Sequence, residues 1–90
     1  MDVYFEESFE EDLKKIKDMK VLQKVKSIID EVRNIANIHE VANLKKLKGY
    51  ETFYRTRFRD YRIGIEAIET KVIFTRCLHR KDIYKHFSKE

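Results

Sequence analysis

The spacing of apolar and polar positions predicts one strand at the start of the chain, two helices after it and three strands in the second half. Residues 2–6 are rich in strand-forming side chains and are long enough for one short strand. The next segment opens with Ser8 and Glu11 at the spacing of a capping box, which predicts a helix over about residues 8–18. Apolar residues recur at helical spacing through this segment, namely Phe9, Leu13 and Ile16.

A second, longer helix is predicted over about residues 20–36. One side of it carries charged residues such as Lys24 and Asp30, so that side can face solvent while the other side packs. The two helices are close in sequence, which favours a helical hairpin. The apolar stripe of the second helix consists of Val21, Leu22, Val25, Ile28, Ile29, Val32 and Ile35.

Residues 37–52 lose this periodicity, and we interpret them as a connector because residues such as Asn37, Asn43 and Gly49 interrupt regular structure. Within the connector, residues 44–49 read Leu-Lys-Lys-Leu-Lys-Gly. This pattern is consistent with one helical turn that is anchored by its two leucines, while its three lysines face solvent.

Three strands are predicted over about residues 53–59, 61–67 and 71–78. Their connections are too short for a crossover helix, so they must pair antiparallel as a meander. A short helix over about residues 80–87 follows. The predicted fold is a single α+β domain over residues 1–90, with a short N-terminal strand, a two-helix hairpin, a three-stranded antiparallel meander that gives a four-stranded sheet in all, and a short C-terminal helix.

The first strand of the meander carries a row of arginines. With a period of two, Tyr54, Thr56 and Phe58 share one face, and the other face carries Phe53 with the arginines at 55, 57 and 59. Like charges at alternate positions repel one another, so stability alone does not favour this row. A guanidinium group fits phosphate oxygens two at a time, and the row therefore indicates recognition of a polyanion.

Composition and size limit what the chain can do. Hydrophobic residues make up 42% and charged residues 40% of the 90 residues, which is enough for one small folded core. The single cysteine, Cys77, cannot form an internal disulfide, and no apolar run approaches the roughly 20 residues of a membrane span. Acidic residues near the start are unlike a basic signal peptide. We therefore expect a cytoplasmic protein without a membrane partner.

Charge is divided unevenly between the two halves of the chain. Residues 1–40 hold 7 Lys/Arg against 10 Asp/Glu, whereas residues 41–90 hold 13 against 6. Such a segregated basic region is typical of nucleic-acid binding, and it is also suitable for an acidic protein partner.

Four motifs in register carry a resemblance to a known family: Leu44-Lys-Lys-Leu-Lys-Gly49, Tyr54-Arg-Thr-Arg57, Asp60-Tyr-Arg-Ile63 and His79-Arg-Lys-Asp-Ile-Tyr84. In this order and spacing the chain resembles the RelE/ParE superfamily of toxins from type II toxin–antitoxin systems, and the RelE branch more than the ParE branch. The resemblance spans nearly the whole chain and agrees with the predicted order of strands and helices.

The resemblance implies a ribosome-dependent endoribonuclease that cuts messenger RNA without a metal or cofactor. In such enzymes the 2′-hydroxyl of the RNA attacks the neighbouring phosphate, so the protein orients the chain, neutralises charge and moves protons. The implied partners are a cognate antitoxin that holds the toxin inactive, the ribosome with its mRNA, and operator DNA only through the antitoxin complex.

The same resemblance assigns catalytic roles to Arg55, Arg57, Arg62, Arg80 and Tyr84. The family has two basic residues on its second strand, usually lysines, where this chain has Arg55 and Arg57. Arginine holds its proton at any working pH, so these two are expected to be phosphate clamps and not general bases.

The proton transfers then need another group, and His79 is the best candidate because imidazole accepts and donates protons near neutral pH. A strand-end histidine that only hydrogen-bonds the backbone is an equally open interpretation. Tyr84 could donate a proton or stack on a base, and Glu66 could be a base or a salt-bridge partner. Weaker, salt-dependent RNA contacts are expected from Lys45, Lys46, Lys48 and Arg59.

Two other functions stay open. A ParE-like toxin would inhibit DNA gyrase by binding and would cut nothing, and a decayed toxin would retain only antitoxin binding. The joint presence of Arg55, Arg57, Arg62, Arg80 and a tyrosine near the end of the chain favours the nuclease, because a binding-only toxin does not need them together.

Overall fold

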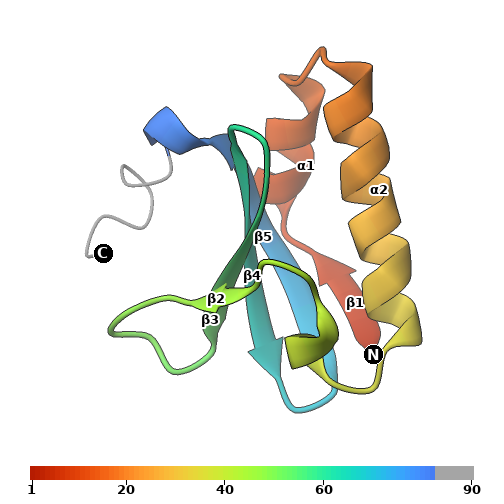
Figure 1. Cartoon of the computed structure of the whole chain (residues 1–90), viewed down its shortest axis with the longest axis vertical. Helices are drawn as coiled ribbons and strands as arrows, with labels where there is room; N and C mark the ends of the chain where they lie inside the picture. Colours follow the sequence, from red (N-terminus) through yellow and green to blue (C-terminus); the bar gives the residue numbers. More distant parts are fainter. Residues whose placement is uncertain (83–90) are drawn as a thin grey trace.

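The computed structural model describes residues 1–82 and shows a mixed five-stranded sheet with two α-helices (Figure 1). A short 3-10 helix, η1, lies in the connector, and residues 80–82 form the start of a last helix. The part of the predicted helix over 83–87 lies outside the described residues. The elements are β1 (Asp2–Phe5), α1 (Glu7–Lys14), α2 (Met19–Asn34), η1 (Ile38–Glu40), β2 (Lys45–Lys46), β3 (Phe53–Phe58), β4 (Tyr61–Ile68) and β5 (Lys71–His79).

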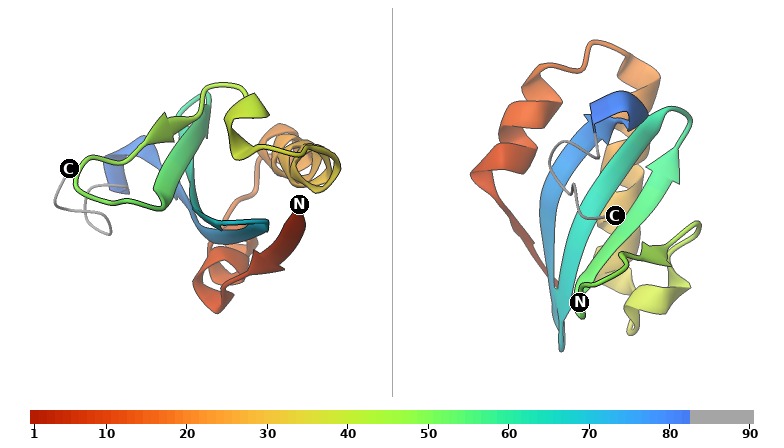
Figure 2. Two further views of the ribbon diagram at one scale, coloured as in Figure 1. Left: turned by 90° about the horizontal axis from the view of Figure 1, so that it is seen from below. Right: turned by 90° about the vertical axis from the view of Figure 1, so that its left-hand side faces the viewer.

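The strands lie in the order β1-β5-β4-β3-β2. The meander β3-β4-β5 is antiparallel, as the short connections predict, and β1 joins β5 in parallel. Figure 2 shows the strands in front of α2, with α1 along the flank of the sheet beside β5. The predicted α+β class, the helical hairpin and the short C-terminal helix are thus confirmed, while the sheet has five strands and not four.

The additional strand is β2. It lies within residues 44–49, where a helical turn was predicted, so that prediction was wrong. Lys45 and Lys46 pair with Arg55 and Tyr54 of β3, and the N–H of Leu47 donates to the carbonyl of Phe53 at 2.8 Å. The segment is extended because β3 offers it backbone partners, which local periodicity does not register. Both lysines are exposed and Leu47 is buried, so the predicted division between solvent and core is correct.

The core lies between α2 and one face of the sheet. The predicted stripe of α2 supplies Val21, Val25, Ile28 and Val32, all buried. Phe9 of α1 packs against Phe74, with ring centroids 5.3 Å apart. The strands contribute Thr56, Ile63, Ile65, Val72, Phe74 and Cys77.

The first helix begins differently from the capping-box prediction. Its N-cap is Glu6, without a side-chain cap, and Ser8 lies within the helix. The hydroxyl of Ser8 instead donates to the carbonyl of Thr75 at 2.7 Å. The helix thereby supplies a partner for the edge of β5 just beyond the end of β1, whose pairing with β5 stops at Phe74. The capping-box spacing at residues 8–11 was therefore the wrong interpretation.

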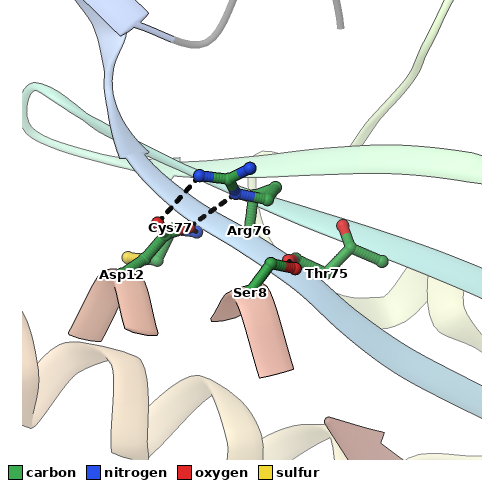
Figure 3. Close-up of polar contacts among 5 residues, drawn as sticks. All are labelled: Ser8, Asp12, Thr75, Arg76 and Cys77. Atoms are coloured by element: carbon green, nitrogen blue, oxygen red, sulfur yellow. Dashed lines mark hydrogen bonds and ion pairs between the residues drawn. The ribbon is translucent and has the colours of Figure 1, made fainter. Parts of the chain in front are cut away.

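One carboxylate completes this contact between α1 and β5 (Figure 3). Asp12 accepts a hydrogen bond from the backbone N–H of Cys77 at 2.9 Å. It also forms a two-point pair with Arg76, whose Nε and Nη2 lie 2.8 and 2.9 Å from its two oxygens. The Asp12 side chain is only 3% exposed, so all three donors act in a largely water-free place.

A bulge in β5 lies directly beside this contact. Gly64 pairs with Arg76 while Ile65 pairs with Phe74, so Thr75 has no opposite residue on β4. An extra residue shifts the alternation of side chains, and both Phe74 and Cys77 therefore face the core although they are three positions apart. Arg76, the residue after the bulge, is the one that binds Asp12 of α1.

Replacement of Asp12 by Asn should destabilise the fold by about 2–4 kcal/mol, because it leaves the Arg76 charge without its partner in a half-buried place. Urea unfolding followed by circular dichroism would measure the loss. The matched control is Glu11→Gln, since Glu11 is exposed and its contact with Lys14 is 3.6 Å long. We expect a change below about 0.5 kcal/mol there, and equal effects of the two variants would contradict the assigned role of Asp12.

Candidate active site

Two of the three arginines in the predicted row, Arg55 and Arg57, lie on the face of the sheet opposite to the core. Arg57 of β3 is paired with Arg62 of β4, and Arg55 is paired with Gly64. Residues that pair directly across two strands have side chains on the same face. The buried Thr56 between them points the other way, into the core. Arg55, Arg57 and Arg62 therefore come together on one surface, which we call the arginine face.

The register extends the arginine face across two further strands. Lys45 of β2 is opposite Arg55, and Arg76 of β5 is opposite Gly64. A cross-strand line thus runs Lys45, Arg55, Gly64, Arg76, with no side chain at its glycine. Arg76 is not among the residues that the sequence pattern indicated. Its alternation with the buried Cys77 is the signal that could have found it.

The charges on this face are unequally compensated. Arg76 is bound to Asp12, and the Nη1 of Arg62 donates to the carbonyls of Arg59 and Tyr61 at 3.0 and 3.2 Å. For Arg55 and Arg57, residues 1–82 provide no salt bridge. These two guanidinium groups are therefore suited to bind an external anion, and they keep their charge at any working pH.

Glu66 also lies on the arginine face, two residue pairs farther along β4 than Gly64. It is opposite Phe53 and Ile73, and its Oε2 accepts a hydrogen bond from the hydroxyl of Thr52 at 3.2 Å. The carboxylate is thus anchored beside the connector.

His79 does not share the arginine face. It is opposite Tyr61, with ring centroids 5.6 Å apart and planes at 77°, and Tyr61 packs against the core. Cys77, two residues earlier on the same side of β5, is buried. The imidazole therefore lies on the helix-covered face of the sheet. Arg57 and Arg62 lie at the same end of the sheet but on the opposite face.

Arg80 lies at this same end. Its backbone N–H donates to the carbonyl of Asp60 at 2.6 Å, and its Nε is 3.7 Å from the carboxylate of Asp60. Both side chains are more than half exposed, so the ion pair is weak and can yield to a ligand. Tyr84, the remaining predicted catalytic residue, lies outside the described residues.

Of the four predicted RNA contacts, only Lys45 joins the arginine face. Lys46 alternates to the other side with Tyr54, and Lys48 is in the turn after β2. Arg59 occupies the β3–β4 turn with φ of 55° and places its guanidinium 5.1 Å from the ring centroid of Phe58. Phe58 alternates with Arg57, so Arg59 is directed away from the arginines.

A hollow of about 280 Å³ lies between the end of α1 and the end of β5. Its walls include Lys15, Ile16, Tyr61, His79 and Asp82. No group of His, Cys, Asp and Glu within residues 1–82 is arranged to hold a metal ion. Nor does any helix in that range have the length and apolar character needed to cross a membrane.

Comparisons with known proteins agree with the fold. Residues 3–84 match the family described as the ParE toxin of the type II toxin–antitoxin system parDE. The chain is 41% identical over 88 residues to the toxin RelE3 of Methanocaldococcus jannaschii, covering 97% of this chain and 99% of that protein. The chain therefore belongs to the RelE/ParE superfamily of toxins from type II toxin–antitoxin systems.

Within that superfamily the chain is RelE-like. It matches the crystal structure of the RelB–RelE antitoxin–toxin complex from Methanococcus jannaschii with a TM-score of 0.82 and 39% identity, covering 93% of this chain and 98% of that one. The isolated E. coli RelE toxin matches with a TM-score of 0.64 and 18% identity, covering 98% and 95%. This second likeness concerns the fold alone.

The buried thiol of Cys77 should be almost unreactive in the folded protein. Burial, and secondarily the charge of Asp12, raise its pKa from 9.0 to about 12. At pH 8.5 the thiolate fraction should be about a thousandfold lower in the folded than in the unfolded chain. Iodoacetamide labelling with and without denaturant measures this, and rapid labelling of the folded chain would contradict it.

The same pKa shift has a consequence for stability at high pH. Above pH 9.0 the unfolded thiol ionises while the folded thiol keeps its proton until about pH 12, so this contribution to stability falls as the pH rises. Cys77→Ala removes the titrating group. Its free energy of unfolding should therefore fall less steeply above pH 9.0 than that of the unaltered protein.

Proposed function

We propose that this chain is a toxin that cleaves messenger RNA on the ribosome by attack of a 2′-hydroxyl on the adjacent phosphate. The observation that carries the proposal is the arginine face, where Arg55, Arg57 and Arg62 of two neighbouring strands meet. None of these three cations has an acid directly opposite it on β3 or β4, and such a group of cations suits a phosphodiester backbone better than it suits stability.

In the proposed reaction the 2′-oxygen forms a new bond to phosphorus and the bond from phosphorus to the 5′-oxygen breaks. One proton leaves the 2′-hydroxyl, another reaches the leaving 5′-oxygen, and the products carry a 2′,3′-cyclic phosphate and a 5′-hydroxyl. Guanidinium groups stabilise the extra negative charge on the pentacoordinate phosphate without moving a proton. Arg55 and Arg57 have no salt bridge within residues 1–82, which makes them the best candidates for this role.

His79, Tyr84 and Glu66 are the candidates for proton transfer, because their side chains can accept or donate a proton. Glu66 shares the arginine face but is anchored by Thr52, and His79 is on the other face. Tyr84, which the family resemblance makes catalytic together with Arg80, belongs to the segment that follows Arg80. The exposed ion pair between Arg80 and Asp60 supports a role of Arg80 in phosphate binding. Arg80 can give up this weak contact with a carboxylate for a stronger contact with a phosphate group.

A cognate antitoxin is the partner that we propose to hold the toxin inactive in the cytoplasm. The relatives include RelE from Methanococcus jannaschii in complex with RelB and E. coli YafQ in complex with DinJ. An acidic antitoxin segment would neutralise the arginine face and exclude RNA from it. Operator DNA would be bound through the complex and not by the toxin alone.

A gyrase-inhibiting toxin is the second candidate, because the family description that matches residues 3–84 is that of ParE. Such a toxin would act by binding alone. A toxin that has lost activity and only binds its antitoxin is a third candidate, and the same experiment separates all three.

Primer extension on a translated message, after induction of the toxin, should reveal discrete cuts within codons. Replacement of Arg57 or Arg62 by Ala should lower cleavage at least about a hundredfold, because each removes a charge that stabilises the transition state. Tyr84→Ala should abolish toxicity as well, without unfolding the chain.

The matched control for these variants is Arg33→Ala, which removes an exposed arginine of α2 that is paired only with Asp30. It should retain toxicity and cleavage. Intact message together with broken or supercoil-altered DNA would reject the nuclease in favour of gyrase inhibition. Folded Arg57 or Tyr84 variants that remain toxic would show that the site lies elsewhere.

A further inference from the structure

His79 forms a specific backbone contact at the point where β5 ends. The Nδ1 of its imidazole lies 3.2 Å from the backbone nitrogen of Lys81 and accepts its hydrogen bond. Residues 80–82 are helical, so Lys81 is the second residue of the last helix and His79 is in the N-cap position. A side-chain acceptor at the N-cap satisfies an N–H group that has no partner inside the helix.

Two further contacts hold the same junction against the β3–β4 turn. The backbone N–H of Arg80 donates to the carbonyl of Asp60, and the Arg80 side chain is paired with the Asp60 carboxylate. The imidazole of His79 meets the edge of the Tyr61 ring. The chain is therefore fixed on three consecutive residues as it leaves β5, next to the end of the sheet where Arg57 and Arg62 lie.

We propose that His79 is a positioning residue: its neutral imidazole fixes the direction in which the chain leaves β5, and thereby the placement of Arg80 next to the arginine face. This rests on the proposed nuclease function. An imidazole that accepts at Nδ1 carries its proton on Nε2. Its one available lone pair is thus occupied by Lys81, and its ring is on the face opposite to the arginines.

The test compares His79→Asn with His79→Ala. Asparagine is among the best N-cap residues and cannot act as a general base near neutral pH, whereas alanine can do neither. We expect cleavage of a translated message to fall about tenfold or more in His79→Ala, and we expect His79→Asn to recover most of that loss. An Asn variant as inactive as the Ala variant, with the cap still formed, would overturn the proposal and assign proton transfer to His79.

Nuclear magnetic resonance reports the cap independently of cleavage. Two-bond ¹H–¹⁵N spectra of the imidazole should show the Nε2–H tautomer, because Nδ1 accepts the hydrogen bond of Lys81. The Lys81 amide should exchange with solvent faster in His79→Ala than in the unaltered protein, and His79→Asn should restore its protection. The Nδ1–H tautomer, or a Lys81 amide whose exchange does not change in His79→Ala, would disprove the cap. If the toxin cuts no message, these spectra still test the cap.

Discussion

The carboxylate of Asp12 holds α1 against β5, and the rest of the fold depends on this contact. It binds the backbone of β5 at Cys77 and the side chain of Arg76, and it projects from a helix that follows β1 directly. Because β1 stops pairing at Phe74, the upper edge of β5 would otherwise expose unpaired backbone groups. Ser8 and Asp12 occupy that edge, where Ser8 binds the carbonyl of Thr75 and Asp12 binds Arg76 and Cys77.

Local patterns were sufficient for most of the fold, and the misses share one physical cause. The stripe of α2 and the short turns of the meander are properties of neighbouring residues, so periodicity predicts them well. Ser8 bonds to Thr75 and β2 pairs with β3, and each choice depends on a partner distant in sequence. The capping box suggested at Ser8 is instead found at η1, where Asn37 and Glu40 form it.

The arginine face was predictable because a two-residue turn between β3 and β4 fixes which residues are opposite each other. This places Arg57 against Arg62 without any knowledge of the rest of the fold. Arg76 and His79 were harder, since both depend on β5. Once Cys77 is known to be buried, alternation places Arg76 with the arginines and His79 away from them. Alternation counted from Ile73 gives the opposite assignment, because the bulge at Thr75 adds one residue to β5.

The parallel pairing of β1 with β5 also governs when the domain can form. The partner residues Asp2 and Lys71 are separated by most of the chain. β5, which lies between β1 and β4 in the sheet, is the last strand along the described residues and is synthesised after the others. A nascent chain therefore cannot close its hydrophobic layer until β5 has left the ribosomal exit tunnel. Such non-local topology slows folding and leaves early segments exposed during translation. The β3–β4 hairpin, which carries the arginine face, can be fixed in the sheet only once β5 is available to pair with β4.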